Sequence, residues 1–348
     1  MRRAVTIKHV AAEAGVSLQT VSRVINKGPN VRPAVIERVE AAVAKLGYVP
    51  SLAARRMGGN RSFLLMALND RDRTIEAWTS GQGADWVDQM LMGGMLRCAE
   101  SGYHMIFELI DTHSAHVERE VQAAISALRP DGLILTPPHS DNPQITGLLV
   151  RLGLPFARLC SETPGDGFAI SMNEALAAQV AVEHLLDLGH RRIGFITGSD
   201  EYAVSAVRRE GWRRAHEDRG LPLDPALEGD GDFTFESGER ATATLLALAE
   251  PPTAILASND QMALAAQTVA AARGLQVPHD LSIVSFDDTP VVRFSRPPMT
   301  AVVQPIAEMT RAAADLLIRA TANVDHLPTS VVVPFGLAVR GSSAPPRS

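Results

Sequence analysis

The sequence predicts an α/β protein with a small helical domain at the N-terminus and a large body of two lobes. Four observations support this. Apolar residues recur at helical spacing in residues 6–46, and strand-like and helix-like segments alternate from residue 62 onward. Basic residues gather in the first sixty positions. The chain of 348 residues is long enough for the helical domain and two further cores.

Residues 6–26 predict two short helices joined by a tight turn. Each helix carries an apolar stripe, Gly15 supplies the turn, and Ser17 is placed to cap the second helix. The outward side chains of the second helix are then Leu18, Gln19, Ser22, Arg23 and Asn26. Because Gln and Arg can pair with base edges and small hydroxyls can meet phosphates, we predict a helix-turn-helix that reads the major groove. An ordinary helical hairpin is the alternative.

Three further features favour DNA binding over that alternative. A third helix begins at Pro33 and ends at Gly47, and a short helical segment follows before two glycines. Residues 1–60 hold ten Lys or Arg against three Glu, a net charge of +7, whereas the whole chain carries −6. A basic head on an acidic body is expected where phosphate binding is confined to one end.

The body alternates strand-like and helix-like segments, which predicts parallel sheets with right-handed crossovers. About 280 residues of such units exceed one core, so we expect two α/β lobes with a ligand site between them, beyond the carboxyl ends of the strands. The strand-like runs are 62–68, 104–110, 132–136, 155–159, 193–197, 254–257 and 282–286, with a last one at 331–339. The helical stretches include 87–100, 117–128, 175–188, 202–218, 237–248 and 261–273.

Several classes of protein are disfavoured by the sequence. No run of 18 apolar residues exists, and the DNA-binding helix begins too early for a signal peptide, so we expect a cytoplasmic, nucleoid-associated protein without a membrane segment. Cys98 and Cys160 are predicted to be buried reduced thiols. No nucleophile motif, phosphate loop or metal-ligand spacing accompanies Asp287-Asp288, so we predict no enzymatic activity, cofactor or metal.

Residues 6–57 resemble the headpiece and hinge of the lactose/galactose-repressor (LacI/GalR) family of bacterial transcription regulators. The resemblance runs through Thr6-Ile7, Val10-Ala11, the segments 14–17 and 20–26, and Leu46-Gly47-Tyr48. Together with the residue chemistry, it implies base readout by Leu18, Gln19 and Arg23. The residues expected on the DNA backbone are Thr6, Ser17, Thr20, Ser22, Asn26, Arg32 and Tyr48. The hinge helix, which in this family folds on the operator, would present Ser51, Ala54, Arg55 and Met57 to the minor groove, with Met57 where the family has a wedging Leu.

The body resembles the effector domain of the same family, which is similar in fold to periplasmic sugar-binding proteins. The resemblance is carried by segments 181–195, 258–264 and 282–289. It implies an α/β effector domain over residues 62–340 whose effector-binding residues are Trp86, Arg208, Phe233, Asn259 and Asp287. Asp287 would accept bonds from paired hydroxyls, Arg208 and Asn259 would donate, and the aromatic residues would wall the site. The loop from Asp70 to Ala84 is longer than usual for the family.

These residues also have structural interpretations. Arg208 could belong to a solvated helical charge cluster, and Trp86 could be a core or lid aromatic. Asp260 could cap the helix that begins at Gln261 rather than contact a ligand. His184 and His190 are expected to pack and cap.

The resemblance implies a repressor of a carbohydrate-utilisation operon that binds double-stranded DNA at a pseudo-palindromic operator as a homodimer. A sugar effector between the lobes would change operator affinity; a purine or other non-sugar co-repressor is the alternative. A sugar-binding protein or enzyme without a DNA role is disfavoured by the basic recognition helix. The expected domains are a headpiece 1–50, a hinge 51–61, lobe one 62–168 plus 294–325, lobe two 169–293 plus 326–340, and a flexible tail 341–348. That tail is too short for a tetramer-forming helix.

Overall fold

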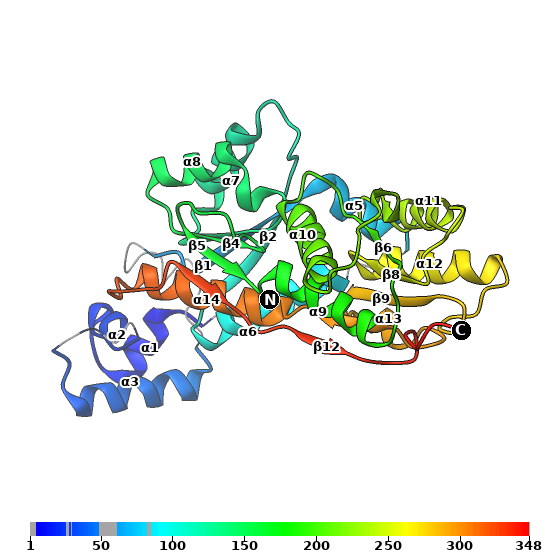
Figure 1. Cartoon of the computed structure of the whole chain (residues 1–348). Helices are drawn as coiled ribbons and strands as arrows, with labels where there is room; N and C mark the ends of the chain where they lie inside the picture. The colour runs from blue at the N-terminus through cyan, green and yellow to red at the C-terminus, as the bar shows by residue number, and fades with distance from the viewer. Residues whose placement is uncertain (1–4, 26–27, 29, 49–60, 82–84, 348) are drawn as a thin grey trace. The chain divides into compact units, whose positions relative to one another are not determined.

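The computed structural model describes residues 5–25, 28, 30–48, 61–81 and 85–347. The chain divides into two compact units, residues 1–64 with 129–131, and residues 65–128 with 132–348. Both lobes belong to the second unit (Figure 1). None of the helices in the described ranges is long and apolar enough to cross a membrane.

The N-terminal unit contains three helices, α1 (Ile7–Ala14), α2 (Leu18–Ile25) and α3 (Pro33–Leu46). Gly15 ends α1 with a φ of 65°, a left-handed conformation that suits glycine, and the next helix begins three residues later. The Ser17 hydroxyl accepts the backbone N–H of Thr20 at 3.1 Å, so Ser17 caps α2 as predicted. The core is formed by Val10, Ala11, Ala14, Val21, Val39, Ala42 and Tyr48.

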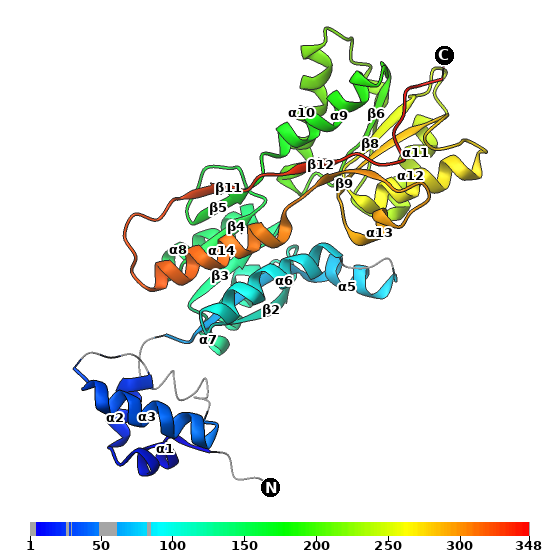
Figure 2. The same ribbon diagram turned by 90° about the horizontal axis from the view of Figure 1, so that it is seen from below.

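Lobe one is a six-stranded sheet in the order β11-β5-β4-β3-β1-β2. Helices α6 and α14 pack together on one face, and α7 and α8 pack together over a separate apolar core (Figure 2). Gly93 allows the close approach of α6 to α14, since a Cβ there would lie 1.9 Å from the carbonyl oxygen of Ala307. The elements are β1 (Leu64–Asp70), α5 (Arg71–Thr79), α6 (Asp85–Glu100), β2 (His104–Ile110), α7 (Val117–Leu128), β3 (Gly132–Leu135), α8 (Pro143–Leu152), β4 (Phe156–Leu159), β5 (Phe168–Ser171), α14 (Ile306–Thr321) and β11 (Ser330–Val332).

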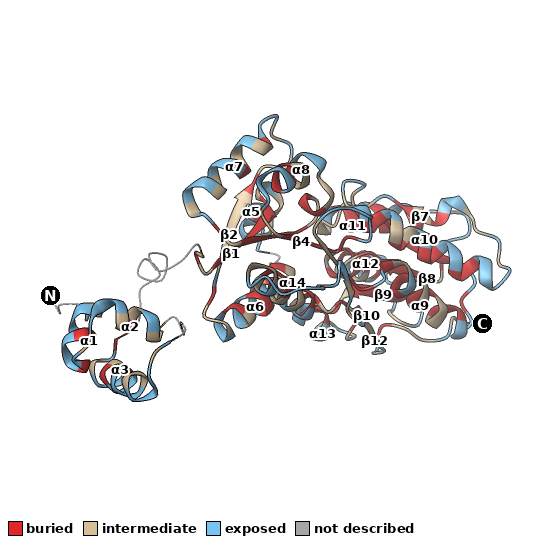
Figure 3. Cartoon of the chain, turned by 90° about the vertical axis from the view of Figure 1, so that its left-hand side faces the viewer, coloured by how far each residue is buried: buried red, intermediate tan, exposed pale blue. Residues whose placement is uncertain are grey.

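Lobe two is a second six-stranded sheet in the order β12-β10-β9-β8-β6-β7, with only the edge strand β12 antiparallel among its described pairs. Helix α9 packs with α10, and α11 packs with α12. Buried residues concentrate on the strands of both lobes (Figure 3). The elements are α9 (Glu174–Asp187), β6 (Ile193–Ile196), α10 (Ala203–Asp218), β7 (Glu228–Gly229), α11 (Phe235–Leu245), β8 (Ala254–Ala257), α12 (Asp260–Ala272), β9 (Ser282–Asp287), α13 (Pro290–Arg293), β10 (Thr300–Val303) and β12 (Gly336–Ala338).

The chain passes between the lobes three times, after β5, after β10 and after β11. These crossings differ from the expected boundaries at 169, 294 and 326, because β5 and β11 pair within the first sheet and β10 pairs with β9 in the second. The expected single strand 331–339 is two short strands, one in each sheet, joined by the third crossing (Figure 2). Hydrogen bonding to different neighbours divides a segment that is uniformly apolar in sequence.

The residues after β12 are held against lobe two, contrary to the expected flexible tail. Ser342 is fully buried, and its hydroxyl accepts the backbone N–H of Thr300 at 2.7 Å. The backbone carbonyl of Ser342 accepts from the N–H of Ile283 at 2.8 Å. The carbonyl of Ala344 accepts from the Ser282 hydroxyl at 3.0 Å. These bonds fasten the segment to the first residues of β9 and β10.

Candidate functional site

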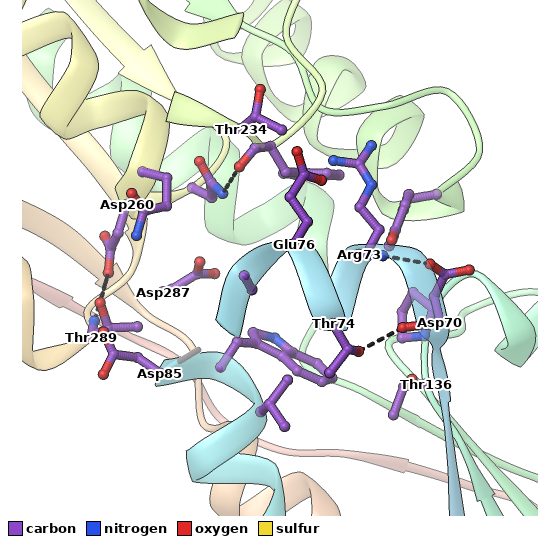
Figure 4. Close-up of a pocket in the computed structure, with 18 of the residues that line it drawn as sticks. Asp70, Arg73, Thr74, Glu76, Asp85, Thr136, Thr234, Asp260, Asp287 and Thr289 are labelled. Carbon is purple, nitrogen blue, oxygen red and sulfur yellow. Dashed lines mark hydrogen bonds between the residues drawn. The ribbon is translucent and has the colours of Figure 1, made fainter. Parts of the chain in front are cut away.

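A cavity of about 290 Å³ lies between the lobes, where the carboxyl ends of the strands of both sheets meet. All five residues predicted to bind an effector line it, which are Trp86, Arg208, Phe233, Asn259 and Asp287. Figure 4 shows side chains from both lobes turned toward this space, with α5 crossing it. No group of three or more His, Cys, Asp or Glu side chains could hold a metal ion within the described part of the chain.

Arg208 is rigidly held at the cavity wall rather than lying on a solvated face. Its side chain is 4% exposed, and Nε donates to the fully buried carboxylate of Glu174 at 2.8 Å. Its Nη1 donates to the carbonyl of Ser258, and the guanidinium stacks on the ring of Phe286 at 3.8 Å. Burial opposes the charged form, but the carboxylates of Glu174 and Asp287 outweigh it and raise the pKa of Arg208. The guanidinium is therefore a charged, preorganised donor.

Asp287 and Asp260 form an acidic pair at the end of β9 and the start of α12. Burial raises the pKa of Asp287 to about 6, although the charge of Arg208 opposes the shift. Burial and the charge of Asp287 raise the pKa of Asp260. Asp260 is occupied structurally, because its carboxylate accepts from the hydroxyl of Ser285 and from both the N–H and hydroxyl of Thr289. Asp287 is thus the member of the pair whose carboxylate can accept hydrogen bonds from a ligand.

Asn259, rather than Asp260, caps helix α12. The Asn259 carbonyl oxygen accepts the N–H of Met262 at 2.9 Å, and its amide donates to the carbonyl of Phe233 at 2.8 Å. One amide hydrogen is left for a ligand. Asn259 therefore fixes the position of Phe233 as well as lining the cavity.

Three aromatic side chains line the cavity, and sequence reasoning found only Trp86 and Phe233. Tyr202 packs edge-on against Phe233, with ring centroids 5.2 Å apart. Gly198 makes room for this pair, because a Cβ there would lie 2.0 Å from the Phe233 ring. Burial raises the pKa of Tyr202 to about 12, so its phenol remains a hydrogen-bond donor. No local sequence pattern distinguishes Tyr202 from an ordinary residue at the start of a helix.

Helix α5 occupies the segment that the sequence showed only as an unusually long loop. Asp70 caps it by accepting the N–H of Arg73 at 2.9 Å, and Arg73 reaches lobe two, where its Nη1 donates to the carbonyl of Asp232 at 2.7 Å. A second polar contact between the lobes joins His113 and Glu201 at 2.7 Å, and this hydrogen bond raises the pKa of His113.

The N-terminal unit presents the side chains predicted to meet DNA. Leu18, Gln19 and Arg23 are exposed on α2, while Val21 is fully buried on its other face. The residues predicted to contact the backbone are distributed as follows: Thr6, Ser17 and Arg32 are exposed, and Thr20 and Ser22 are half-buried. The pattern matches the expected division of α2 into a core face and an outer face.

The remaining residues predicted to contact DNA are a buried tyrosine and several residues that the structure does not describe. Tyr48, expected on the DNA backbone, belongs to the core of the N-terminal unit with 6% of its surface exposed. Burial of its aromatic ring in this core stabilises the unit more than exposure of the ring to water would. Asn26 and the predicted hinge residues Ser51, Ala54, Arg55 and Met57 lie outside the described residues.

Helix α6 carries an uncovered apolar face in lobe one. Met92, Met95 and Leu96 are each more than half exposed, whereas Met90 and Cys98 on the opposite side are buried. Large apolar side chains clustered at an exposed helix face commonly mark a protein–protein interface.

Comparison with known proteins decides the family. Residues 6–51 match the model for bacterial regulatory proteins of the lacI family, and residues 182–343 match the periplasmic binding protein-like domain. The HTH-type transcriptional regulator CelR of Thermobifida fusca is 32% identical over 98% of this chain and 99% of its own length. The chain belongs to the lacI family. It is therefore a DNA-binding transcriptional regulator, not an enzyme.

Solved structures of this family share the whole architecture. The CelR–cellobiose complex aligns with a TM-score of 0.73 at 30% identity and covers 97% of this chain and all of that one. The Lac repressor dimer bound to operator and the anti-inducer ONPF aligns with a TM-score of 0.80 at 27% identity, covering 98% of this chain and all of that one. Among relatives, the ribose operon repressor of Escherichia coli (strain K12) is 31% identical over 90% of this chain and 92% of its own length. The predicted family and fold class are confirmed.

Proposed function

We propose that this lacI-family regulator is a homodimeric repressor whose operator affinity is controlled by a sugar bound between the lobes. The observation that carries the proposal is the composition of the cavity, which combines fixed donors, carboxylate acceptors and aromatic walls. Two relatives support the ligand class by their names, the regulator solved with cellobiose and the ribose operon repressor. The regulated genes would then serve carbohydrate use.

The chemistry of the cavity suits hydroxyl groups. Above its pKa, the Asp287 carboxylate accepts two hydroxyl hydrogens, while the guanidinium of Arg208 donates to a ring oxygen or hydroxyl. Trp86 and Phe233 present apolar surface for the carbon face of a sugar ring. A purine would leave these carboxylates facing ring nitrogens that are mostly acceptors, an unfavourable pairing in a desolvated site.

On DNA, we propose that Leu18, Gln19 and Arg23 of α2 contact base edges, and that the exposed hydroxyls beside them contact phosphates. Two copies of α2 would read the two halves of a pseudo-palindrome. The apolar face of α6 is the proposed dimer contact. The related Lac repressor was solved as a dimer, which supports the proposed oligomeric state. We expect the protein in the cytoplasm, associated with the nucleoid.

The effector would act by favouring one angle between the lobes. Because both lobes contribute to one cavity, a ligand that bridges them binds one arrangement more tightly than another, and this difference is the coupling energy. A coupling of about 1–3 kcal/mol would change operator affinity roughly 5- to 150-fold.

The test uses the full-length protein. Its operator is selected from random duplexes, and the affinity is then measured by fluorescence anisotropy with and without a panel of neutral sugars and purines. We expect at least one sugar both to raise the melting temperature and to change operator affinity. Asp287→Asn should retain operator binding and lose the sugar response. A response to purines and to no sugar would overturn the proposed ligand class.

A further inference from the structure

Helix α5 is built into the cleft as an additional wall. Its first turn is anchored at the end of β1, where Thr74 donates its hydroxyl to the carbonyl of Asp70 at 2.6 Å and Thr112 donates to the Asp70 carboxylate. Its last turn is anchored to lobe one by Trp78, whose ring lies 6.1 Å from that of Phe107 on β2. The hydrogen bonds of the first turn and this ring contact hold α5 against lobe one, so that one face of the helix is turned toward the cavity.

The face of α5 turned toward the cavity is polar and carries both signs of charge. Arg73, Thr74, Glu76, Ala77 and Ser80 line the cavity from this helix. Figure 4 shows Arg73 and Glu76 extending from α5 on the side of lobe two. These two side chains approach the cavity from lobe one, whereas Arg208 and Asp287 approach it from lobe two.

Arg73 is only partly committed to the protein. One of its guanidinium nitrogens donates to the Asp232 carbonyl, and the group lies 5.9 Å from the Tyr202 ring centroid. Among the described residues no carboxylate lies within ion-pair distance of Arg73, although its charge contributes to lowering the pKa of Asp232. A guanidinium has five N–H donors, so most remain for a ligand that lies beside it.

Glu76 is uncommitted as well. Its side chain is exposed at the cavity wall, and no described residue donates a hydrogen bond to its carboxylate. A carboxylate next to a guanidinium on one helix face can bind a diol from both sides, because one group accepts and the other donates.

Resting on the proposed sugar effector, we propose that α5 forms a second sugar-binding subsite, in which Arg73 and Glu76 bind an outer ring while Arg208 and Asp287 bind an inner one. The effector is then an oligosaccharide of at least two rings. Arg73 would connect the outer ring to the Asp232 carbonyl and so stabilise the closed arrangement of the lobes. Single-ring sugars would occupy only the inner part.

The test is calorimetric titration of the full-length dimer with ribose, glucose and galactose as single-ring probes and with cellobiose, maltose and lactose as two-ring probes. We expect a two-ring sugar to bind at least tenfold more tightly than its component rings. Arg73→Ala and Glu76→Ala should each remove most of this advantage, about tenfold, as expected for loss of a charge-assisted hydrogen bond. Affinity for the single rings should stay within twofold.

Arg71→Ala is the matched control. Arg71 lies on the same helix but pairs with Asp111 at 3.3 Å and Glu120 at 3.5 Å within lobe one, and it does not line the cavity. This variant should keep the wild-type preference, and thermal melting of all three variants checks their folding.

The possible failures can be told apart. If a sugar binds but the preference for two rings survives in both Arg73→Ala and Glu76→Ala, the α5 subsite is overturned while the sugar effector stands. Equal losses for one-ring and two-ring sugars would also overturn it, because the residues would then act on the inner site. If wild type binds none of the six sugars, the sugar effector and the subsite fail together.

Discussion

The ion pair between Arg208 and Glu174 is predicted to be a major contribution to the stability of lobe two as well as to ligand binding. Arg208→Met removes the charge and keeps apolar contact with the Phe286 ring. Glu174 is 0% exposed, and its carboxylate would keep only a 3.4 Å contact from the amide of Gln304. A buried carboxylate that keeps only one weak hydrogen bond destabilises the folded protein, because its charge remains desolvated without a counter-charge.

The expected magnitude follows from the burial of both partners. Removing one member of a buried pair costs about 3–5 kcal/mol, because the other charge stays desolvated. Replacing both members by apolar side chains of similar volume is often close to neutral. We therefore expect Arg208→Met to lower the free energy of unfolding by about 3–5 kcal/mol. The double variant Arg208→Met/Glu174→Met should recover more than half of that loss.

The assay is urea unfolding followed by circular dichroism and tryptophan fluorescence, at one protein concentration because dimerisation adds to apparent stability. Arg214→Met is the control on the same helix. Arg214 pairs with Glu210 at 2.8 Å but is more than half exposed, so its loss should cost below about 1 kcal/mol. An Arg208→Met variant as stable as this control, or a double variant no more stable than the single one, would refute the reasoning.

Three further predictions concern DNA, assembly and pH. Arg23→Ala should reduce the binding free energy by about 1–3 kcal/mol per half-site and relax the preference at one base pair of the operator, whereas Thr20→Ala should weaken binding to all DNA sequences alike. If wild type and Arg23→Ala show identical base preferences in an operator selection, Arg23 contacts phosphate instead. Leu96→Glu should shift the protein to monomer in analytical ultracentrifugation, because it places a charge in the apolar face of α6; an unchanged dimer would place the interface elsewhere. Burial raises the pKa of Asp287 to about 6 in the folded state, so the folded protein binds this proton more tightly than the unfolded chain does. As pH falls from about 6 to 4, the free energy of unfolding of wild type should therefore rise relative to that of Asp287→Asn. If the two proteins show the same pH dependence of unfolding across that range, the shift is contradicted.

Local pattern in the sequence was sufficient for most elements. The helices of the N-terminal unit, the capping by Ser17 and the division of α2 into two faces all follow from 3.6-residue periodicity and turn chemistry. The alternation of strands and helices predicted two parallel sheets, and the resemblance to the family placed five side chains that the structure brings to one cavity. Each of these inferences depends on residues close together in sequence or on matched motifs.

The remaining features depend on contacts between distant segments. The resemblance to the family implied a DNA-backbone contact for Tyr48, but its side chain packs in the core that α1, α2 and α3 form. The segment 331–338 is apolar throughout, yet pairing with β5 and then with β10 divides it between two lobes.

The cavity is the clearest example of a feature that depends on contacts between distant segments. The resemblance to the family implied that Arg208 and Asp287 lie at a site between the lobes, and both line the cavity there. Only the tertiary structure decided that Glu174 lies beneath Arg208 and that Tyr202, Arg73 and Glu76 complete the wall. A side chain's partners and desolvation are set by which strands and helices meet in the fold, and a chain read one segment at a time does not contain that information.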